Sequence, residues 1–217
     1  MPVFTYSKHE TQYLTERDPV LGQAIQVIGP ISREVDPDLF SALVKSMVSQ
    51  QISSKAYHTI WQRMLAAQGP ITPRSLIKAG PEIVQSYGMS MKKAVNIVEA
   101  AERVLSGELD LNGLHALTDE EVCAELTRLK GIGVWTAEML MTFSMQRPDV
   151  ISFGDLAIHR GMRMLYQLDK VDRSQFNRFR ERYSPFASVA SLYLWAISAG
   201  ALDRSMSPAY LGRANPE

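Results

Sequence analysis

The sequence has little of what builds disulfide or metal frameworks. Cys123 is the one cysteine among its 217 residues, which excludes a disulfide framework, a four-thiolate zinc site and a cysteine-ligated iron–sulfur cluster. The four histidines stand far apart along the chain, so there is no local histidine metal motif. They are His9, His58, His115 and His159. We therefore predict no required cofactor.

Long apolar runs and an excess of charge are also lacking. No stretch approaches the ~18 uninterrupted apolar residues of a membrane span, and the N-terminal residues lack a charged head followed by an apolar run, so secretion is not indicated. Basic and acidic residues balance at 23 each. A zero net charge argues against long-range attraction to polyanions but is compatible with a local basic face. We expect a cytosolic protein without membrane contact.

Helical spacing of apolar residues recurs along almost the whole chain, and no sustained alternation predicts a strand. Two of the predicted helices span residues 134–145 and 155–168. Residues 2–6 and 150–153 are the only strand-like segments. Helix-start signals stand at Asp18-Pro19, Asp36-Pro37, Thr72-Pro73, Ser90, Thr118 with Glu121, Ser174 and Pro185. The pattern predicts an all-α protein.

No change in composition marks a clean linker, and the loop at residues 107–117 is the best candidate boundary. We predict a single catalytic unit, residues 1–217, made of two helical lobes with a cleft between them. The approximate lobes are residues 36–106 and 118–201. Residues 1–35 are expected to pack on the second lobe.

The most informative stretch runs from Leu129 to Ala137, where a helix ends, two glycines flank one apolar residue and a new helix begins. Glycines let the main chain approach a ligand closely, and the first N–H groups of a helix attract anions. We therefore predict that Gly131, Gly133 and Thr136 contact a phosphate, while Ile132 points inward. The alternative is a plain helical hairpin with a glycine turn.

This stretch resembles the helix-hairpin-helix of the DNA glycosylase superfamily that is named for this hairpin and for a Gly/Pro-rich loop followed by an aspartate. Within it, the chain looks most similar to the alkylated-base (3-methyladenine) glycosylases over residues 36–201. Four further stretches carry the resemblance: Met47–Ser53, Tyr87–Ile97, Phe153–Gly161 and Tyr183–Trp195. The resemblance implies a two-lobed helical glycosylase fold.

Asp155 matches the superfamily's catalytic aspartate, as the resemblance implies. Breaking an N-glycosidic bond leaves positive charge on the sugar, which an ionised carboxylate stabilises, and the same group can orient the attacking water. The alternative role of Asp155 is a helix N-cap. Two other carboxylates are weaker candidates, since Glu138 is expected on a solvated helix face and Asp149 in a turn.

The resemblance also implies a reaction type and a base pocket. Bifunctional members place a lysine where this chain has Trp135, so a monofunctional enzyme is expected. A cationic base binds aromatic faces, which favours Trp135, Met139 and Trp195 as pocket residues, although these side chains are equally typical of a core. Met139 replaces a tyrosine of the best-known bacterial relative, and Ala187 stands where relatives commonly carry arginine.

DNA contacts are expected from a polar break between two apolar helices and from basic side chains. Gln51, or else Gln50, would fill the space that a flipped base leaves; the alternative is a capping loop with two solvated glutamines. The candidates for backbone contact are Lys92, Lys93, Lys130, Arg160 and Arg163. The resemblance further suggests a Na⁺ or K⁺ ion on the main-chain carbonyls of Thr127, Leu129 and Ile132.

Taken together, the resemblance implies a monomeric enzyme that excises alkylated purines from double-stranded DNA and so begins base-excision repair. It would act in a bacterial cytosol, or in a nucleus if the source is eukaryotic. Two alternatives stay open: a glycosylase of the same fold for another damaged or mismatched base, and a non-catalytic hairpin module that only holds DNA.

Overall fold

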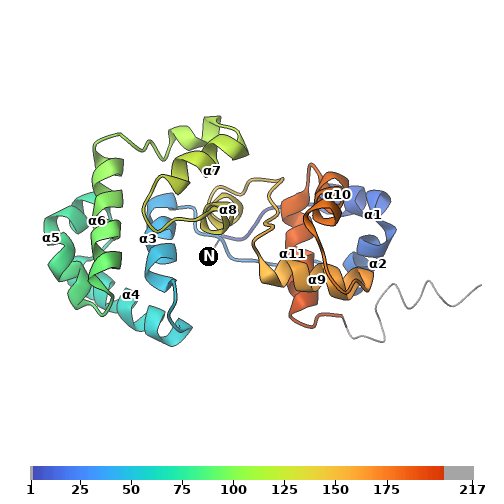
Figure 1. The fold of residues 1–217 in the computed structure, drawn as a ribbon, viewed down its shortest axis with the longest axis horizontal. Helices are drawn as coiled ribbons and strands as arrows, with labels where there is room; N and C mark the ends of the chain where they lie inside the picture. Colours follow the sequence, from blue (N-terminus) through green and yellow to red (C-terminus); the bar gives the residue numbers. More distant parts are fainter. Residues whose placement is uncertain (1, 203–217) are drawn as a thin grey trace, which may run out of the picture. The chain divides into compact units, whose positions relative to one another are not determined.

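The computed structural model describes residues 2–202, and the regular structure there is helical (Figure 1). Within these residues the one strand-like feature is an isolated bridge between Val3 and Glu34. The helices are α1 Lys8–Arg17, α2 Pro19–Ile28, α3 Leu39–Ser49, α4 Ser54–Gln68, α5 Pro73–Ser86, α6 Met91–Leu105, the 3₁₀ turn η1 Gly113–Ala116, α7 Asp119–Thr127, α8 Val134–Phe143, α9 Leu156–Tyr166, α10 Arg173–Tyr183 and α11 Ala187–Ser198. The all-α prediction is confirmed.

Local signals explain most helix ends, and one helix was missed. α7 begins with the predicted capping box of Thr118 and Glu121, whose two hydrogen bonds measure 2.8 and 3.2 Å. The missed helix is α1, which also starts with a capping box, formed by Ser7 and Glu10. It buries only Leu14 fully, so its apolar periodicity is too weak to indicate a helix.

The chain divides into two compact units, and the predicted boundary was wrong. Among the described residues, unit 1 comprises residues 2–35 and 146–202, and unit 2 comprises residues 36–145. The loop at 107–117 therefore lies inside unit 2, and the hairpin at 129–137 belongs with residues 36–106. The N-terminal segment groups with the elements after residue 145, whereas residues 118–145 of the predicted second lobe belong to unit 2.

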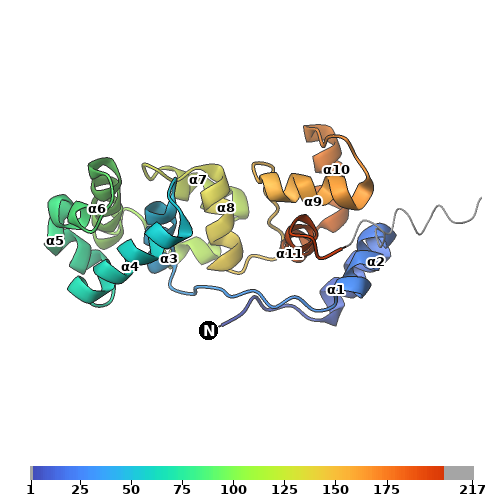
Figure 2. The ribbon, with the colours of Figure 1, turned by 90° about the horizontal axis from the view of Figure 1, so that it is seen from below.

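Unit 2 is a helical body in which α5 and α6 lie side by side and α3 packs against α4, α6 and α8 (Figures 1 and 2). α5 is broken at Gly80, whose φ of 74° is in the left-handed region, directly before Pro81. The end of α3 and the hairpin between α7 and α8 are both neighbours of α6, through contacts described below.

Unit 1 is built around the pair α9 and α11, which lie against each other in both views (Figures 1 and 2). This close approach is possible because residue 161 of α9 is glycine. A Cβ there would overlap the main-chain carbonyl of Leu194 on α11. A larger residue at 161 would push the two helices apart. The start of α9, where Asp155 stands, is thus fixed by the packing of its helix.

A buried polar cluster joins the start of α2 to α9 and α10. Asp18 is 1% exposed, and its Oδ2 accepts 2.8 Å hydrogen bonds from the Tyr166 hydroxyl and the Arg182 guanidinium. Its Oδ1 caps α2. The hydroxyls of Tyr166 and Tyr183 are 2.6 Å apart. Burial, reinforced by Tyr183 and by the Asp18 charge, raises the pKa of Tyr166 well above its ordinary value.

Candidate functional site

The hairpin of unit 2 has the geometry of an anion-binding turn. α7 ends at Thr127, and Gly133 is the N-cap of α8 with no side-chain capping bond. Ile132 is 5% exposed, and its N–H donates to the Leu129 carbonyl at 3.1 Å. The start of α8 therefore lacks a side-chain cap, as is typical of helix N-termini that bind an anion.

The two glycines of the hairpin are needed for different reasons. Gly131 has φ 89°, and a Cβ there would lie 3.2 Å from the Asn96 amide nitrogen, so the protein itself requires glycine. Gly133 has φ −94°, which any residue adopts, and a Cβ there would meet nothing within 4 Å. Glycine at 133 thus leaves open space beside the main chain, as close approach of a ligand requires.

The predicted residues of α8 differ in accessibility. Thr136 is 7% exposed, so a phosphate contact there would come from its main-chain N–H and not its hydroxyl. Trp135 is 48% exposed and Met139 is half-buried one turn later on the same helix. Together, Trp135 and Met139 present an indole and a thioether beside the hairpin.

The two candidate glutamines lie in the loop of residues 49–53, which we call the wedge loop, and they have different surroundings. The Gln50 side-chain amide donates a 2.8 Å hydrogen bond to the Gly131 carbonyl and so joins this loop to the hairpin. Gln51 is exposed with φ 55°. A left-handed non-glycine residue costs about 1 kcal/mol, but Gln146 and Gln167 of unit 1 share this conformation, so exposure and not strain distinguishes Gln51 from Gln50. Gln51 therefore remains the better candidate for insertion.

The basic side chains predicted to contact the DNA backbone differ in their exposure and in their bonding partners. Lys92 is exposed, and Lys130 forms a 3.0 Å ion pair with Glu99 on the surface. The Lys93 ammonium donates to the main-chain carbonyls of Val48 and Gln50, and burial lowers its pKa. Two of its three N–H groups thus already have acceptors within the protein, and its role as a phosphate contact stays a prediction. In unit 1, Arg160 and Arg163 are exposed on α9.

Asp155 stands at the start of α9 as its N-cap. Its Oδ1 accepts hydrogen bonds from the N–H groups of Ala157 and Ile158 at 2.8 and 3.0 Å. The residue is 7% exposed, between exposed Gly154 and Leu156. The capping bonds fix the carboxylate at the helix start while its neighbours reach solvent.

The loop before Asp155 is held by aromatic packing. The Arg173 guanidinium lies 3.5 Å from the centre of the Phe153 ring, which also packs edge-on against Phe176 and His159. The His159 Nε2 and the Phe153 carbonyl are 2.7 Å apart. These contacts order the backbone that leads into the carboxylate.

Leu156 is apolar but does not lie on the buried side of α9. Ile158, Met162 and Leu165 of the same helix are fully buried. Leu156 is 84% exposed. An exposed leucine next to Asp155 is a candidate contact for a ligand, and its position off the buried stripe was the signal that could have indicated this.

The remaining predicted residues of unit 1 are mainly structural. Ala187 is fully buried and donates its N–H to Asp149 at 3.2 Å, and Asp149 also accepts a 2.6 Å bond from Ser184. Asp149 is thus a turn residue, as expected, and the small side chain at 187 is packed inside. Trp195 of α11 is half-buried. Since Trp195 lies in unit 1 and Trp135 in unit 2, neither unit alone contains the predicted pocket.

In unit 2, Glu138 is half-buried and not on a solvated face. Burial and the charges of Glu138 and Glu120 raise the pKa of the Cys123 thiol.

No group of His, Cys, Asp or Glu within residues 2–202 is arranged to hold a metal ion. An alkali ion on the carbonyls of Thr127, Leu129 and Ile132 stays a prediction; the Leu129 carbonyl, which accepts from Ile132, keeps a second lone pair for it.

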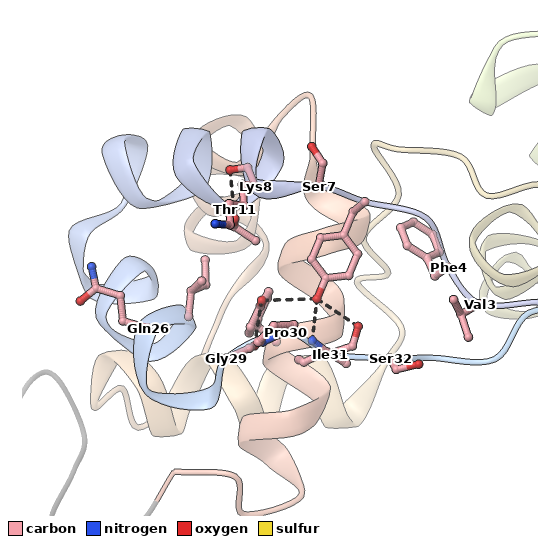
Figure 3. A pocket seen from close by; sticks show the side chains of 13 residues that line it. Val3, Phe4, Ser7, Lys8, Thr11, Gln26, Gly29, Pro30, Ile31 and Ser32 are labelled. Carbon is pink, nitrogen blue, oxygen red and sulfur yellow. Dashed lines mark hydrogen bonds between the residues drawn. The ribbon is translucent and has the colours of Figure 1, made fainter.

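Unit 1 also has a cavity of about 530 Å³ between its N-terminal segment and α2 (Figure 3). None of the predicted site residues lines it. The Tyr6 hydroxyl bonds the main chain of Ile31, and the Tyr193 hydroxyl donates to the Gly29 carbonyl at 3.1 Å. The two tyrosine hydroxyls of this cavity thus serve the fold. Separately, no helix of the described chain is long and apolar enough to span a membrane.

Comparisons with known proteins agree with this geometry. Residues 44–185 match the model of the HhH-GPD superfamily base excision DNA repair proteins. DNA-3-methyladenine glycosylase 1 of Schizosaccharomyces pombe is 34% identical over 165 residues, 73% of this chain and 72% of that protein. The crystal structure of a DNA-3-methyladenine glycosidase from Bacillus halodurans aligns with a TM-score of 0.87 and 33% identity, covering 97% of this chain and 99% of that one.

A second solved structure is the S. pombe 3-methyladenine DNA glycosylase in complex with abasic DNA, with a TM-score of 0.75 and 29% identity over 90% of this chain and 99% of that one. An 8-oxoguanine glycosylase/lyase of Clostridium acetobutylicum, 21% identical with a TM-score of 0.74, shares the fold. The family match covers more than half of the chain and includes the hairpin and Asp155. The chain therefore belongs to the HhH-GPD superfamily of base excision DNA repair proteins.

Proposed function

We propose that this protein is a monofunctional DNA glycosylase that hydrolyses the N-glycosidic bond of alkylated purines, such as 3-methyladenine, in double-stranded DNA. The observation that carries the proposal is the Asp155 carboxylate, fixed as the cap of α9 and flanked by exposed residues. The names of the relatives support the choice of substrate.

In this reaction the role of Asp155 is to stabilise positive charge on the sugar, which does not require it to be a strong base. As the bond between sugar and base breaks, both electrons leave with the base and the sugar becomes oxocarbenium-like. A fixed carboxylate stabilises that charge and orients the water that adds to the sugar. A purine alkylated on a ring nitrogen is already cationic, so it leaves as a neutral base and needs no general acid.

DNA binding is assigned to unit 2. The N-terminus of α8, which has no side-chain cap, would bind a backbone phosphate, and Gln51 would fill the space left by the flipped nucleotide. Exposed Trp135 and the neighbouring Met139 would contact the cationic base. We propose further that the enzyme acts as a monomer without a required cofactor, in a bacterial cytosol or a nucleus.

The proposed experiment measures free bases released from methylated duplex DNA by chromatography. Release of 3-methyladenine at a rate well above the spontaneous one is expected. Release confined to DNA with oxidised guanine or a mismatch would assign another substrate, and binding without release of any base would indicate a non-catalytic module. Both outcomes would refute the proposal.

The monofunctional assignment has its own test. Trp135 occupies the position at which a lysine would attack the sugar and form a Schiff base. We expect borohydride to trap no covalent adduct between protein and damaged DNA, and the strand to stay intact at the abasic site. A trapped adduct would contradict this assignment while leaving glycosylase activity in place.

A further inference from the structure

Helix α6 presents a stripe of polar side chains to both predicted DNA-contacting loops. Lys93, Asn96, Glu99 and Arg103 are spaced three or four residues apart, which places them on one face of the helix. The wedge loop and the hairpin follow α3 and α7, two helices that end near this face. We call these four residues the α6 stripe.

At one end of the stripe, Lys93 serves the end of α3. Its ammonium donates to the Val48 carbonyl at 3.0 Å and to the Gln50 carbonyl. The last carbonyls of a helix lack partners within it, and a cation there also interacts favourably with the helix dipole. Gln50 is the C-cap of α3 and immediately precedes Gln51. Lys93 thus binds the residue from which the left-handed turn starts.

At the other end, the stripe serves α7 and the hairpin. The Arg103 guanidinium donates to the Arg128 carbonyl, at the C-cap of α7, at 3.0 Å. Glu99 pairs with Lys130 at 3.0 Å, and Asn96 lies against Gly131. The bond from Gln50 to the Gly131 carbonyl then connects the two loops directly. The α6 stripe therefore sets the position of each loop, and Gln50 sets one against the other.

We propose that the α6 stripe is the positioning element of the DNA-binding face, and that Lys93 is the residue that holds Gln51 ready for insertion into the duplex. The proposal rests on the proposed function, and it deepens the binding part of it. Lys93 acts through Gln51 and touches no DNA itself, since its ammonium is half-buried and bonded to two carbonyls.

The test uses the full-length protein and a duplex that contains an abasic-site analogue. Lys93→Met keeps the length of the side chain and removes the charge; Lys78→Met, on the exposed face of α5, is the control for charge loss. We expect Lys93→Met to weaken binding about fivefold, as much as loss of the Gln51 side chain itself, and Lys78→Met to leave it unchanged. Lys93→Arg, which can still donate to helix-end carbonyls, should recover most of the affinity.

Two readouts separate positioning from direct contact. The first readout is the slope of the logarithm of the binding constant against the logarithm of the salt concentration. Loss of a phosphate contact reduces the size of this slope by about one, whereas Lys93→Met should leave it unchanged. In a Gln51→Ala background, Lys93→Met should add less than a twofold loss, because both substitutions remove the same insertion. Additive losses, or a slope lower by one, would overturn the proposal.

A further measurement guards against misfolding and against failure of the proposed function. Hydrogen exchange at the amides of residues 50–52 should accelerate in Lys93→Met while the amides of α6 stay protected; protection lost throughout unit 2 would mean that Lys93 supports folding generally, against the proposal. None of these readouts needs turnover. If the wild-type protein releases no base, the enzyme assignment fails, and binding still decides the role of Lys93.

Discussion

The two units hold their functional groups in different ways. In unit 1, Asp155 belongs to a helix fixed by a buried network, in which Asp18 is 1% exposed and Tyr183 fully buried. In unit 2, the wedge loop and the hairpin are fixed by bonds from side chains to main-chain carbonyls, with Lys93 and Gln50 only partly buried. Unit 1 holds its helices with buried side chains, and unit 2 holds its loops with side chains that donate to main-chain carbonyls.

This difference fits the two tasks. A carboxylate that stabilises charge on one sugar atom must keep a single position, which a buried and fully bonded network provides. Loops that bind a DNA backbone of any sequence present main-chain N–H groups, which carry no sequence information. The following changes test this contrast, from the largest expected effect to the smallest.

Asp155→Asn should separate catalysis from capping in unit 1. Asparagine caps helices as well as aspartate does, so α9 should keep its stability, while loss of the charge should slow excision about 100- to 1,000-fold. Single-turnover release of 3-methyladenine measures the effect. Asp172→Asn, at the N-cap of α10, is the matched control and should be as active as the wild type. Near-normal excision by Asp155→Asn would remove this residue from the mechanism.

Asp18→Ala should show how far unit 1 depends on its buried network. It leaves the Tyr166 hydroxyl and the first amides of α2 without their acceptor. We expect the free energy of unfolding to fall by about 3 kcal/mol, a figure that gives little weight to the half-exposed Arg182. Asp38→Ala, an exposed N-cap in unit 2, should cost only about 1 kcal/mol. Equal losses in denaturant unfolding would erase the contrast.

Gly133→Ser should weaken DNA binding without weakening the fold. Serine is a good N-cap and meets no atom within 4 Å, so stability should be kept, but its side chain would occupy the amides intended for a phosphate. We expect about a tenfold loss of affinity for abasic duplex. Gly131→Ala should instead cost about 1–2 kcal/mol in stability because of its φ of 89°. Unchanged binding by Gly133→Ser would contradict the phosphate site.

Gln51→Ala should produce the smallest effect. Loss of the inserted side chain should reduce affinity for abasic duplex about fivefold, since part of the unstacking energy is no longer offset. Gln167 has almost the same backbone conformation in unit 1, with φ 54°, so Gln167→Ala controls for the backbone and should bind normally. Equal affinity of both variants in a fluorescence titration would dismiss the insertion role.

Sequence predicted the local features of the protein well. Capping boxes, helix-start prolines and the two glycines of the hairpin act within a few residues of chain, so helix ends such as those of α7 and α8 could be predicted. The identification of Asp155 depended on a resemblance that spans most of the chain. α1 was missed because its capping signal stands before a sequence that buries a single leucine.

By itself, then, the sequence determined the helices, the hairpin turn and the carboxylate at the head of α9, because each depends on bonds between neighbours in the chain. The tertiary structure decided that residues 107–117 do not divide the molecule, that Leu156 faces solvent, and that Lys93 binds carbonyls at the end of α3. A charged side chain has the same sequence signal whether it meets solvent, a phosphate or a helix end. Its partner is chosen only when distant segments pack together.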